Sequence, residues 1–292
     1  MNKVKIISDS TCDLGLDLAK ELDVRIVPLY VTFNEESYLD GETIKTQDVY
    51  EKVAEKGYLP KTAAVTQETF YSVFKEYLDL GYDIVFTGIS KQMSRTYESA
   101  VLAARELDDS RVFVVDSMNL STGIGLLVLK ACKFRDEGKS AKEIAELLND
   151  LNKRVKSQFA IETMEYLYKG GRCSGMAKFF GTLLKIKPVI FVRNGKMCVG
   201  KKPIGKMKIA LDAMLDMIRE DKEKNNIDLD HIFITDSIAP ESYEYLDKKL
   251  KEEFEGVDII HTTAGCVIAS HCGPGTIGIL YITKDLTSKE EI

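Results

Sequence analysis

The stretch from Ile84 to Ser117 reads IVFTGISKQMSRTYESAVLAARELDDSRVFVVDS and decides the fold class. Ile84–Thr87 is a short apolar run with β-branched and aromatic residues, which predicts a strand. We expect a helix from about Ser94 to Leu107 and a second strand at Val112–Val115. A strand, a helix and a strand in this order predict a βαβ unit and therefore a parallel sheet.

The same alternation extends along the rest of the chain. The clearest helix start is Ser140, because Glu143 follows three residues later as in a capping box. We therefore expect an α/β fold of two domains, with mainly parallel sheets flanked by helices and a boundary near residue 157 that separates 1–157 from 158–292. Further strands are predicted at Val4–Ile7, Val24–Val31, Val189–Val192, Ile232–Thr235 and Ile277–Ile282, and further helices at Phe70–Leu78, Met207–Ile218 and Tyr243–Phe254.

Composition favours an ordinary globular protein. Of the 292 residues 45% are hydrophobic and 29% are charged, and the formal charge of -6 argues against a nucleic-acid partner. No segment predicts a secretory signal or a stable membrane insertion; the stretch between Asp258 and Lys284, which lacks charged residues, is interpreted as buried strands and loops. None of the six cysteines forms a C-x-x-C pair, so zinc and redox motifs are unsupported. We expect a cytoplasmic protein with buried, reduced thiols.

Three predicted strands end in the same two residues, at Asp9-Ser10, Asp116-Ser117 and Asp236-Ser237. Such side chains commonly supply turn and cap oxygens where a strand leads into a helix, and we favour that role over ligand binding for any one pair. Their position is the one functional hint, since open α/β sheets bind ligands outside the carboxyl ends of their strands.

Gly273-Pro-Gly275-Thr-Ile-Gly278 fits the pattern G-x-G-x-x-G of dinucleotide sites. That fingerprint requires a helix directly after it, whereas Ile277–Ile282 predicts a strand. The NAD interpretation therefore fails. We expect these glycines to allow a tight turn and a close approach of the backbone, as would occur beside a ligand.

Other residues have the chemistry of a binding or catalytic site. A serine hydrolase would use Ser94 or Ser270 with His271, but no G-x-S-x-G elbow exists in the chain. Arg172 follows Lys169-Gly-Gly and presents a planar fork suited to a carboxylate or phosphate, with a surface turn as the plain alternative. The hydroxyls of Thr62 and Ser94 lie near predicted helix starts, where two of them together would hold a carboxylate and each alone would be an ordinary N-cap.

Nine stretches form a set that spans nearly the whole chain. They are I-I-S-D-S-T-C-D-L (6–14), Val27-Pro-Leu29, Tyr38-Leu-Asp-Gly41, Lys61-Thr62, I-S-K-Q-M-S-R-T-Y-E-S-A (89–100), V-V-D-S (114–117), Y-L-Y-K-G-G-R-C-S (166–174), L-L-K-I-K-P-V-I (183–190) and S-H-C-G-P-G-T-I-G (270–278). Each motif alone is unspecific, but their number, order and spacing make the set specific. Together they resemble the motifs of the DegV family of bacterial fatty-acid-binding proteins.

The resemblance implies one DegV-type unit over residues 3–285 that holds a long-chain fatty acid, for example palmitate (hexadecanoate), in a tunnel. It implies that Thr62 and Ser94 hold the carboxylate. His271, Arg172, Arg95 and Ser10 are secondary candidates for the head group or a partner. Some members supply the fatty acid to a fatty-acid kinase, which binds its own ATP. The chain would then be a carrier rather than an enzyme, without a cofactor or a metal of its own.

Two positions depart from the family pattern. The family's T-S-Q-P segment is Thr62-Ala-Ala-Val65 in this chain, and the glycine of the family's S-G-T-Y segment is Arg95. Arg95 would pair with the head group, narrow the mouth of the tunnel or point to solvent. Two alternatives stay open. One is an acyl hydrolase or a phosphotransferase subunit that uses Ser94, His271 and Arg172; the other is a binding module for another small anion.

Overall fold

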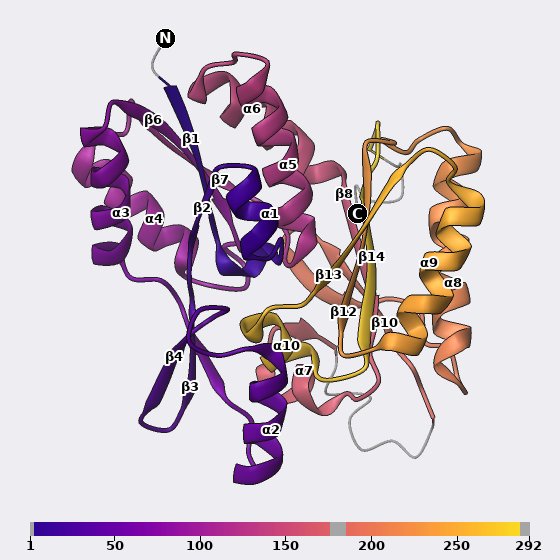
Figure 1. The fold of residues 1–292 in the computed structure, drawn as a ribbon. Coiled ribbons are helices and arrows are strands. Elements are labelled where there is room, and N and C mark those ends of the chain that lie inside the picture. Colours follow the sequence, from indigo (N-terminus) through magenta and orange to yellow (C-terminus); the bar gives the residue numbers. More distant parts are fainter. Residues whose placement is uncertain (1–2, 176–184, 287–292) are drawn as a thin grey trace.

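Three sheets form the framework of the computed structural model, which describes residues 3–175 and 185–286 (Figure 1). The N-terminal sheet has the strand order β2-β1-β6-β7, and its strands are parallel to their neighbours. They are β1 (Lys3–Asp9), β2 (Val24–Val27), β6 (Tyr82–Gly88) and β7 (Val112–Asp116). The predicted βαβ unit is confirmed, because α4 (Thr96–Leu107) joins β6 to β7.

Helices cover both faces of this sheet (Figure 1). α3 (Gln67–Asp79) packs with α4 on one face, and α5 (Thr122–Asp136) packs with α6 (Ala141–Leu151) on the other; α1 (Leu16–Glu21) lies against β2. The capping box at Ser140 and Glu143 is present as predicted. α5 also contacts strands of the C-terminal sheet, so it is buried between the two large sheets.

The single strand predicted at Val24–Val31 is wrong, because the chain changes sheets within it. β2 ends at Val27, and β3 (Tyr30–Phe33) joins a small antiparallel sheet with β4 (Glu36–Leu39) and β5 (Lys61–Ala63); α2 (Thr46–Lys56) lies between β4 and β5 in the chain. Pro28 has no N–H to offer a ladder, and the backbone of Leu29 is used elsewhere: its N–H donates to Ser10 Oγ at 3.1 Å, and its carbonyl accepts from Asp40 N at 3.0 Å.

The C-terminal sheet has seven strands in the order β13-β12-β14-β8-β10-β11-β9. It is mixed rather than mainly parallel, since β14 is antiparallel to both its neighbours. Its strands are β8 (Val155–Ala160), β9 (Cys173–Ser174), β10 (Val189–Arg193), β11 (Lys196–Val199), β12 (His231–Ser237), β13 (Asp258–Thr263) and β14 (Thr276–Ile282). α8 (Met207–Glu223) and α9 (Pro240–Glu253) cover one face, and α5 lies on the other. Residue 157 falls inside β8, and the division into 1–157 and 158–292 remains a proposal.

Two short helices lie where the C-terminal half meets the N-terminal half. α7 (Glu165–Gly170) and α10 (Cys266–Cys272) pack against each other, and α10 also contacts α2, β3 and β5 of the N-terminal half. α10 lies in the stretch between Asp258 and Lys284 for which only strands and loops were expected. Its first N–H groups donate to buried aspartates of the N-terminal half, from Gly265 to Asp13 (2.9 Å) and from Cys266 to Asp40 (2.7 Å).

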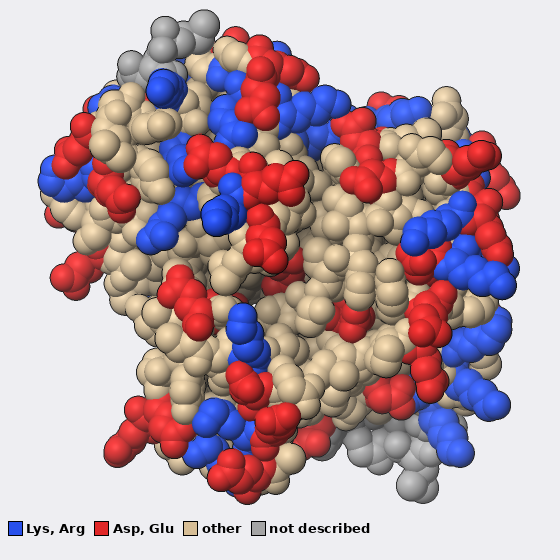
Figure 2. Space-filling view, viewed as in Figure 1, with Lys and Arg blue, Asp and Glu red and all other residues tan. Residues whose placement is uncertain are grey.

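Other expectations concern the surface and the cysteines. None of the helices in the described ranges has both the length and the apolarity needed to cross a bilayer. The six cysteines are all free thiols, five of them buried and Cys198 partly exposed. Charged side chains of both signs are interspersed on the face shown in Figure 2. Residues 183 and 184 of the L-L-K-I-K-P-V-I motif lie outside the described residues.

Candidate functional site

A cavity of about 440 Å³ lies between the C-terminal sheet and the loops and helices of the N-terminal half. This volume is within the usual range of small-molecule sites. Its apolar lining is formed by Leu29, Ile89, Met93, Leu120, Phe159, Leu167, Met197, Val267, Ile268 and Leu280. Its polar lining includes Thr62, Ser94, Ser121, Arg172, Thr235, Ser237, His271 and Thr276. The cavity therefore suits a ligand that is mainly apolar and has at least one polar end.

Strand periodicity builds the floor of the cavity. Side chains alternate between the two faces of a sheet, and paired residues of neighbouring strands share a face. Ser237 of β12 pairs with Thr276 of β14, and Thr235 pairs with Gly278, which in turn pairs with Phe159 of β8. All five residues line the cavity. The intervening apolar side chains of these strands pack under α8 and α9 instead.

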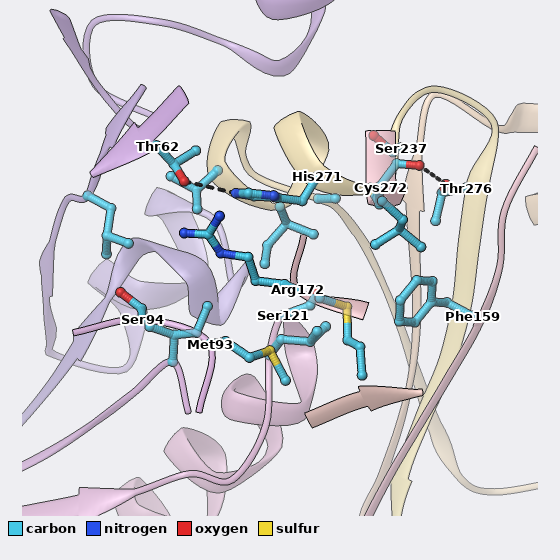
Figure 3. A pocket seen from close by; sticks show the side chains of 18 of the residues that line it. Thr62, Met93, Ser94, Ser121, Phe159, Arg172, Ser237, His271, Cys272 and Thr276 are labelled. Carbon is cyan, nitrogen blue, oxygen red and sulfur yellow. Dashed lines mark hydrogen bonds between the residues drawn. The ribbon is translucent and has the colours of Figure 1, made fainter. Parts of the chain in front are cut away.

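The polar end of the cavity brings together residues that are far apart in the sequence. Thr62 lies on β5 and His271 near the end of α10, and Thr62 Oγ1 is 2.8 Å from His271 Nε2 although 209 positions separate them. Arg172, directly after α7, is exposed but also lines the cavity. In Figure 3 its guanidinium group lies between the Thr62–His271 pair and Ser94. We call Thr62, Ser94, Arg172 and His271 the polar end.

A glycine turn places two members of this group. Gly170 ends α7, and a Cβ built on it would lie 2.5 Å from His271 Nδ1, so the imidazole packs directly on this backbone. Gly171 has φ +68°, a conformation that glycine adopts readily, and it turns the chain toward the cavity. Arg172 Nη1 then donates to the Gly170 carbonyl at 2.7 Å. Gly170 and Gly171 thus allow His271 and Arg172 to lie where they do.

His271 is electrically neutral at physiological pH. Burial, followed by the positive charge of Arg172, lowers the pKa of His271 to about 4. Its Nδ1 is buried and has no hydrogen-bond partner among the described residues. Because an unpaired buried N–H is rarer than an unpaired acceptor, we assign the proton to Nε2, which donates to Thr62 Oγ1. The Thr62 hydroxyl keeps its own proton for a ligand in the cavity.

Ser94 and Thr62 are held by different local structures. Ser94 Oγ accepts from Thr96 N at 3.3 Å and lies 3.0 Å from Thr96 Oγ1, so it lies at the start of α4 as predicted. Thr62 is part of a strand, and the cap of α3 is Thr66, whose hydroxyl accepts from Thr69 N. The interpretation of Thr62 as a residue at a helix start is therefore wrong, although its hydroxyl does line the cavity.

Two secondary candidates do not join the polar end. The side chain of Arg95 is 89% exposed and pairs with Glu98 at 3.4 Å, so it points to solvent at the outer edge of the cavity. Ser10 is absent from the described lining of the cavity. Its hydroxyl donates to Asp40 at 2.8 Å and accepts from Leu29 N, which fixes the loop between β2 and β3.

The repeated Asp-Ser pairs act mainly as turn and cap residues, as favoured from the sequence. Asp9 accepts from Thr11 N, Asp116 from Met118 N and Asp236 from Ala239 N. The third pair also lies in the cavity lining, where Ser237 Oγ is 2.5 Å from the hydroxyl of Tyr50.

Ser121 also lines the cavity but was not predicted from the sequence. Its hydroxyl donates to Asp13 at 2.5 Å, and its backbone has φ +51°, an uncommon value for a residue other than glycine. No sequence pattern predicts a positive φ at a serine. The apolar lining was equally unassigned, because tunnel residues and core residues have the same composition.

The geometry offers no support for the hydrolase alternative within the described residues. Ser94 bonds to Thr96, and Ser270 Oγ donates to the Cys266 carbonyl at 2.6 Å, so neither serine is paired with His271. No third group from the described parts of the chain orients His271 from its Nδ1 side. Among the described residues, no cluster of three histidines, cysteines or carboxylates is arranged to hold a metal ion.

Residues 3–284 match the family described as "Uncharacterised protein, DegV family". The chain belongs to the DegV family. A DegV relative from Thermotoga maritima named "Fatty acid-binding protein" is 33% identical, and the alignment covers 94% of this chain and 96% of that protein. A DegV family protein from Thermus thermophilus, whose solved structure is described in terms of fatty acid binding, is 32% identical with a TM-score of 0.88, over 96% of this chain and 99% of that one. A stearic acid-binding protein from Eubacterium ventriosum is 27% identical with a TM-score of 0.83, over 96% and 98%.

Proposed function

We propose that this DegV protein binds a long-chain fatty acid in the 440 Å³ cavity and holds its carboxylate at the polar end. The observation that carries the proposal is the combination of an apolar cavity with Thr62, Ser94, Arg172 and His271 gathered at one end of it. The relatives from Thermotoga maritima, Thermus thermophilus and Eubacterium ventriosum are described as fatty-acid-binding proteins, which supports the choice of a fatty acid.

The apolar part supplies the affinity. Burying a methylene group is worth about 0.8 kcal/mol, so a palmitate chain gains on the order of 10 kcal/mol before the costs of association. The walls offered by Ile89, Met93, Leu167 and Leu280 provide that environment. Because a hydrocarbon makes no directional contacts, the head group must fix the orientation of the ligand.

The polar end has donors suited to a carboxylate. The Thr62 hydroxyl is free to donate, since it accepts from His271, and Ser94 offers a second hydroxyl. Arg172 adds a full positive charge within the same part of the cavity. Neutral hydroxyls orient the carboxylate, and the guanidinium group balances its charge.

Presentation of the fatty acid to a kinase would follow from this arrangement, because the polar end includes an exposed residue, Arg172. In this proposal the chain is a carrier that performs no chemistry itself, and a partner kinase supplies the ATP. The cytoplasmic location stays a prediction from the sequence.

The test compares palmitate with its methyl ester, which retains the chain but lacks the charge. Calorimetric titration of delipidated protein should show tight binding of palmitate and weaker binding of the ester. Ser94→Ala and Thr62→Val should each weaken palmitate about three- to tenfold and leave the ester unchanged. Ser72→Ala is the matched control, since its hydroxyl bonds within α3 to the Glu68 carbonyl. Equal affinities for acid and ester in all four proteins would contradict the assigned polar end.

A further inference from the structure

The floor of the cavity is unexpectedly polar at some distance from the polar end. Ser237 of β12 and Thr276 of β14 face each other in register and both line the cavity. In Figure 3 they lie across the cavity from Thr62 and Ser94, beyond Arg172 and near Phe159. A plain hydrocarbon chain gains nothing from hydroxyl groups at such a position.

The hydrogen bonds of these hydroxyls determine what they offer to a ligand. Thr276 Oγ1 donates its proton to the Cys272 carbonyl at 2.8 Å, so its remaining capacity is that of an acceptor. Ser237 Oγ is fixed 2.5 Å from the Tyr50 hydroxyl, which α2 holds in place. Both hydroxyl oxygens are therefore held in fixed positions. Thr276 Oγ1 can accept a hydrogen bond from a ligand but has no proton left to donate to one.

Gly278 leaves this part of the cavity floor without a side chain. It lies in β14 between Thr276 and Leu280 on the cavity face, and a glycine inside a strand often marks a close approach of a ligand. A Cβ at this position would lie 3.0 Å from the Gln158 carbonyl and 3.1 Å from Phe159 Cβ. Gly273 and Gly275, with φ +77° each, instead form the turn that leads into β14. The predicted turn is therefore present at Gly273 and Gly275, and the close approach at Gly278 is that of β8; the approach of a ligand stays a prediction.

We propose that the Ser237–Thr276 floor, opened by Gly278, recognises a hydroxyl group on the acyl chain, so that the preferred ligands include hydroxylated long-chain fatty acids. The inference rests on the proposed binding of a fatty acid and specifies the class of acyl chain. The hydroxyl of the ligand donates to Thr276 Oγ1. A keto group at the same place has no proton to donate and is not favoured.

The test uses stearate, a stearate hydroxylated near the middle of the chain, the corresponding ketostearate, and alpha-hydroxystearate, whose hydroxyl is next to the carboxylate. An apolar tunnel would bind the mid-chain hydroxyl compound about tenfold more weakly than stearate, because the hydroxyl loses its water without a partner. We expect instead that it binds about three- to tenfold more tightly than stearate, and that the ketone and the alpha-hydroxy compound show no such gain.

Thr276→Val keeps the shape of the side chain and should abolish the preference, which is measured as the ratio of the affinities for the hydroxylated stearate and for stearate. A circular dichroism spectrum and a melting temperature like those of the unmodified protein show that the variant is folded. Ser237→Ala, which tests the same floor from β12, should reduce the preference as well. The control is Thr263→Val, an exposed threonine of β13 that is not among the described residues lining the cavity.

The outcomes separate the two proposals. If stearate binds and the hydroxylated chain binds more weakly, the inference about the floor is wrong and the binding of fatty acids stands. If the preference exists but survives in both variants, the floor is not its source and the inference is overturned. If no fatty acid binds, the proposed function fails and this inference fails with it.

Discussion

Replacing Thr62 by valine tests the link between the two halves of the polar end. The change preserves the branched shape suited to β5 and removes only the hydroxyl that lies 2.8 Å from His271 Nε2. Since Nδ1 is already buried without a partner among the described residues, the variant leaves both ring nitrogens of His271 unpaired. The structure therefore predicts a larger effect than the loss of an ordinary surface hydrogen bond.

The expected loss of stability follows from the one hydrogen bond that is removed and the ring nitrogen that is left unpaired. A hydrogen bond contributes about 0.5–1.5 kcal/mol, and an unpaired group that has lost its water costs about 1–3 kcal/mol. Thr62 is only partly buried, and water can replace part of the lost contact. We therefore expect the free energy of unfolding of the ligand-free protein to fall by about 1–2 kcal/mol, and the affinity for palmitate to fall about three- to tenfold.

Urea denaturation of delipidated protein and palmitate titration measure the two quantities. Thr263→Val, an exposed threonine on an edge strand, is the matched control and should change the free energy of unfolding by less than about 0.5 kcal/mol. A Thr62→Val protein as stable as this control would show that the Thr62–His271 bond does not exist in solution. The neutral tautomer assigned to His271 would then lose its basis.

Three further substitutions test other parts of the structure. Burial, only partly offset by its hydrogen bonds, raises the pKa of Asp9 from 3.8 to about 6. The folded state therefore keeps a proton on Asp9 between these values, and the free energy of unfolding falls by about 2–3 kcal/mol as the pH rises through this window. Because burial also raises the pKa of Asp13 and of Asp40, Asp9→Asn should reduce this fall without abolishing it in urea denaturation at pH 4 to 8, and an unchanged slope would contradict the assignment. Arg172→Gln should raise the pKa of His271 above its value of about 4 in an NMR titration, because the charge of Arg172 contributes to the low value, and no shift would place the two groups too far apart. Gly170→Ala should push the His271 ring away from Thr62 and lower the affinity for palmitate about tenfold. Lys169→Ala, on the exposed side of α7, is the control and should leave that affinity unchanged. Equal palmitate affinities of the two variants would refute the packing of His271 on Gly170.

The elements predicted correctly from the sequence are those with a distinct pattern. β6 and β7 are short, largely apolar runs, because helices cover both faces of their sheet. α4 and the helix after Ser140 have an amphipathic period, because each exposes one side to water. α5 was missed for the opposite reason. Its residues Thr122–Cys132 are all buried between two sheets, so the helix is apolar all round and shows no amphipathic period.

α10 illustrates a second limit of the sequence. It is seven residues long and carries Val267 and Ile268, which do not favour a helix, so local preference predicts none. Its N-terminus is instead fixed by Asp13 and Asp40, more than 200 positions earlier in the chain. Contacts of this kind form only when the whole chain has folded. Because His271 lies on α10, its position also depends on these contacts.

The sequence allowed the residues of the polar end to be named, but it did not predict how they are arranged. Thr62, Ser94, His271 and Arg172 all line one cavity, as the motif resemblance suggested. The strand position of Thr62 and the outward direction of Arg95 were not predictable, because both depend on how β5 and the loop before α4 pack. The hydroxyls on the cavity floor depend on the register of β12 with β14, which no local pattern specifies.

The proposed role of this DegV protein as a fatty-acid carrier is tested most directly by mass spectrometry of the organic extract from freshly purified, denatured protein. We expect a long-chain fatty acid at close to one molecule per chain, and its identity would show whether the acyl chain is hydroxylated. An empty extract, followed by no uptake from a panel of long-chain fatty acids, would contradict the carrier role.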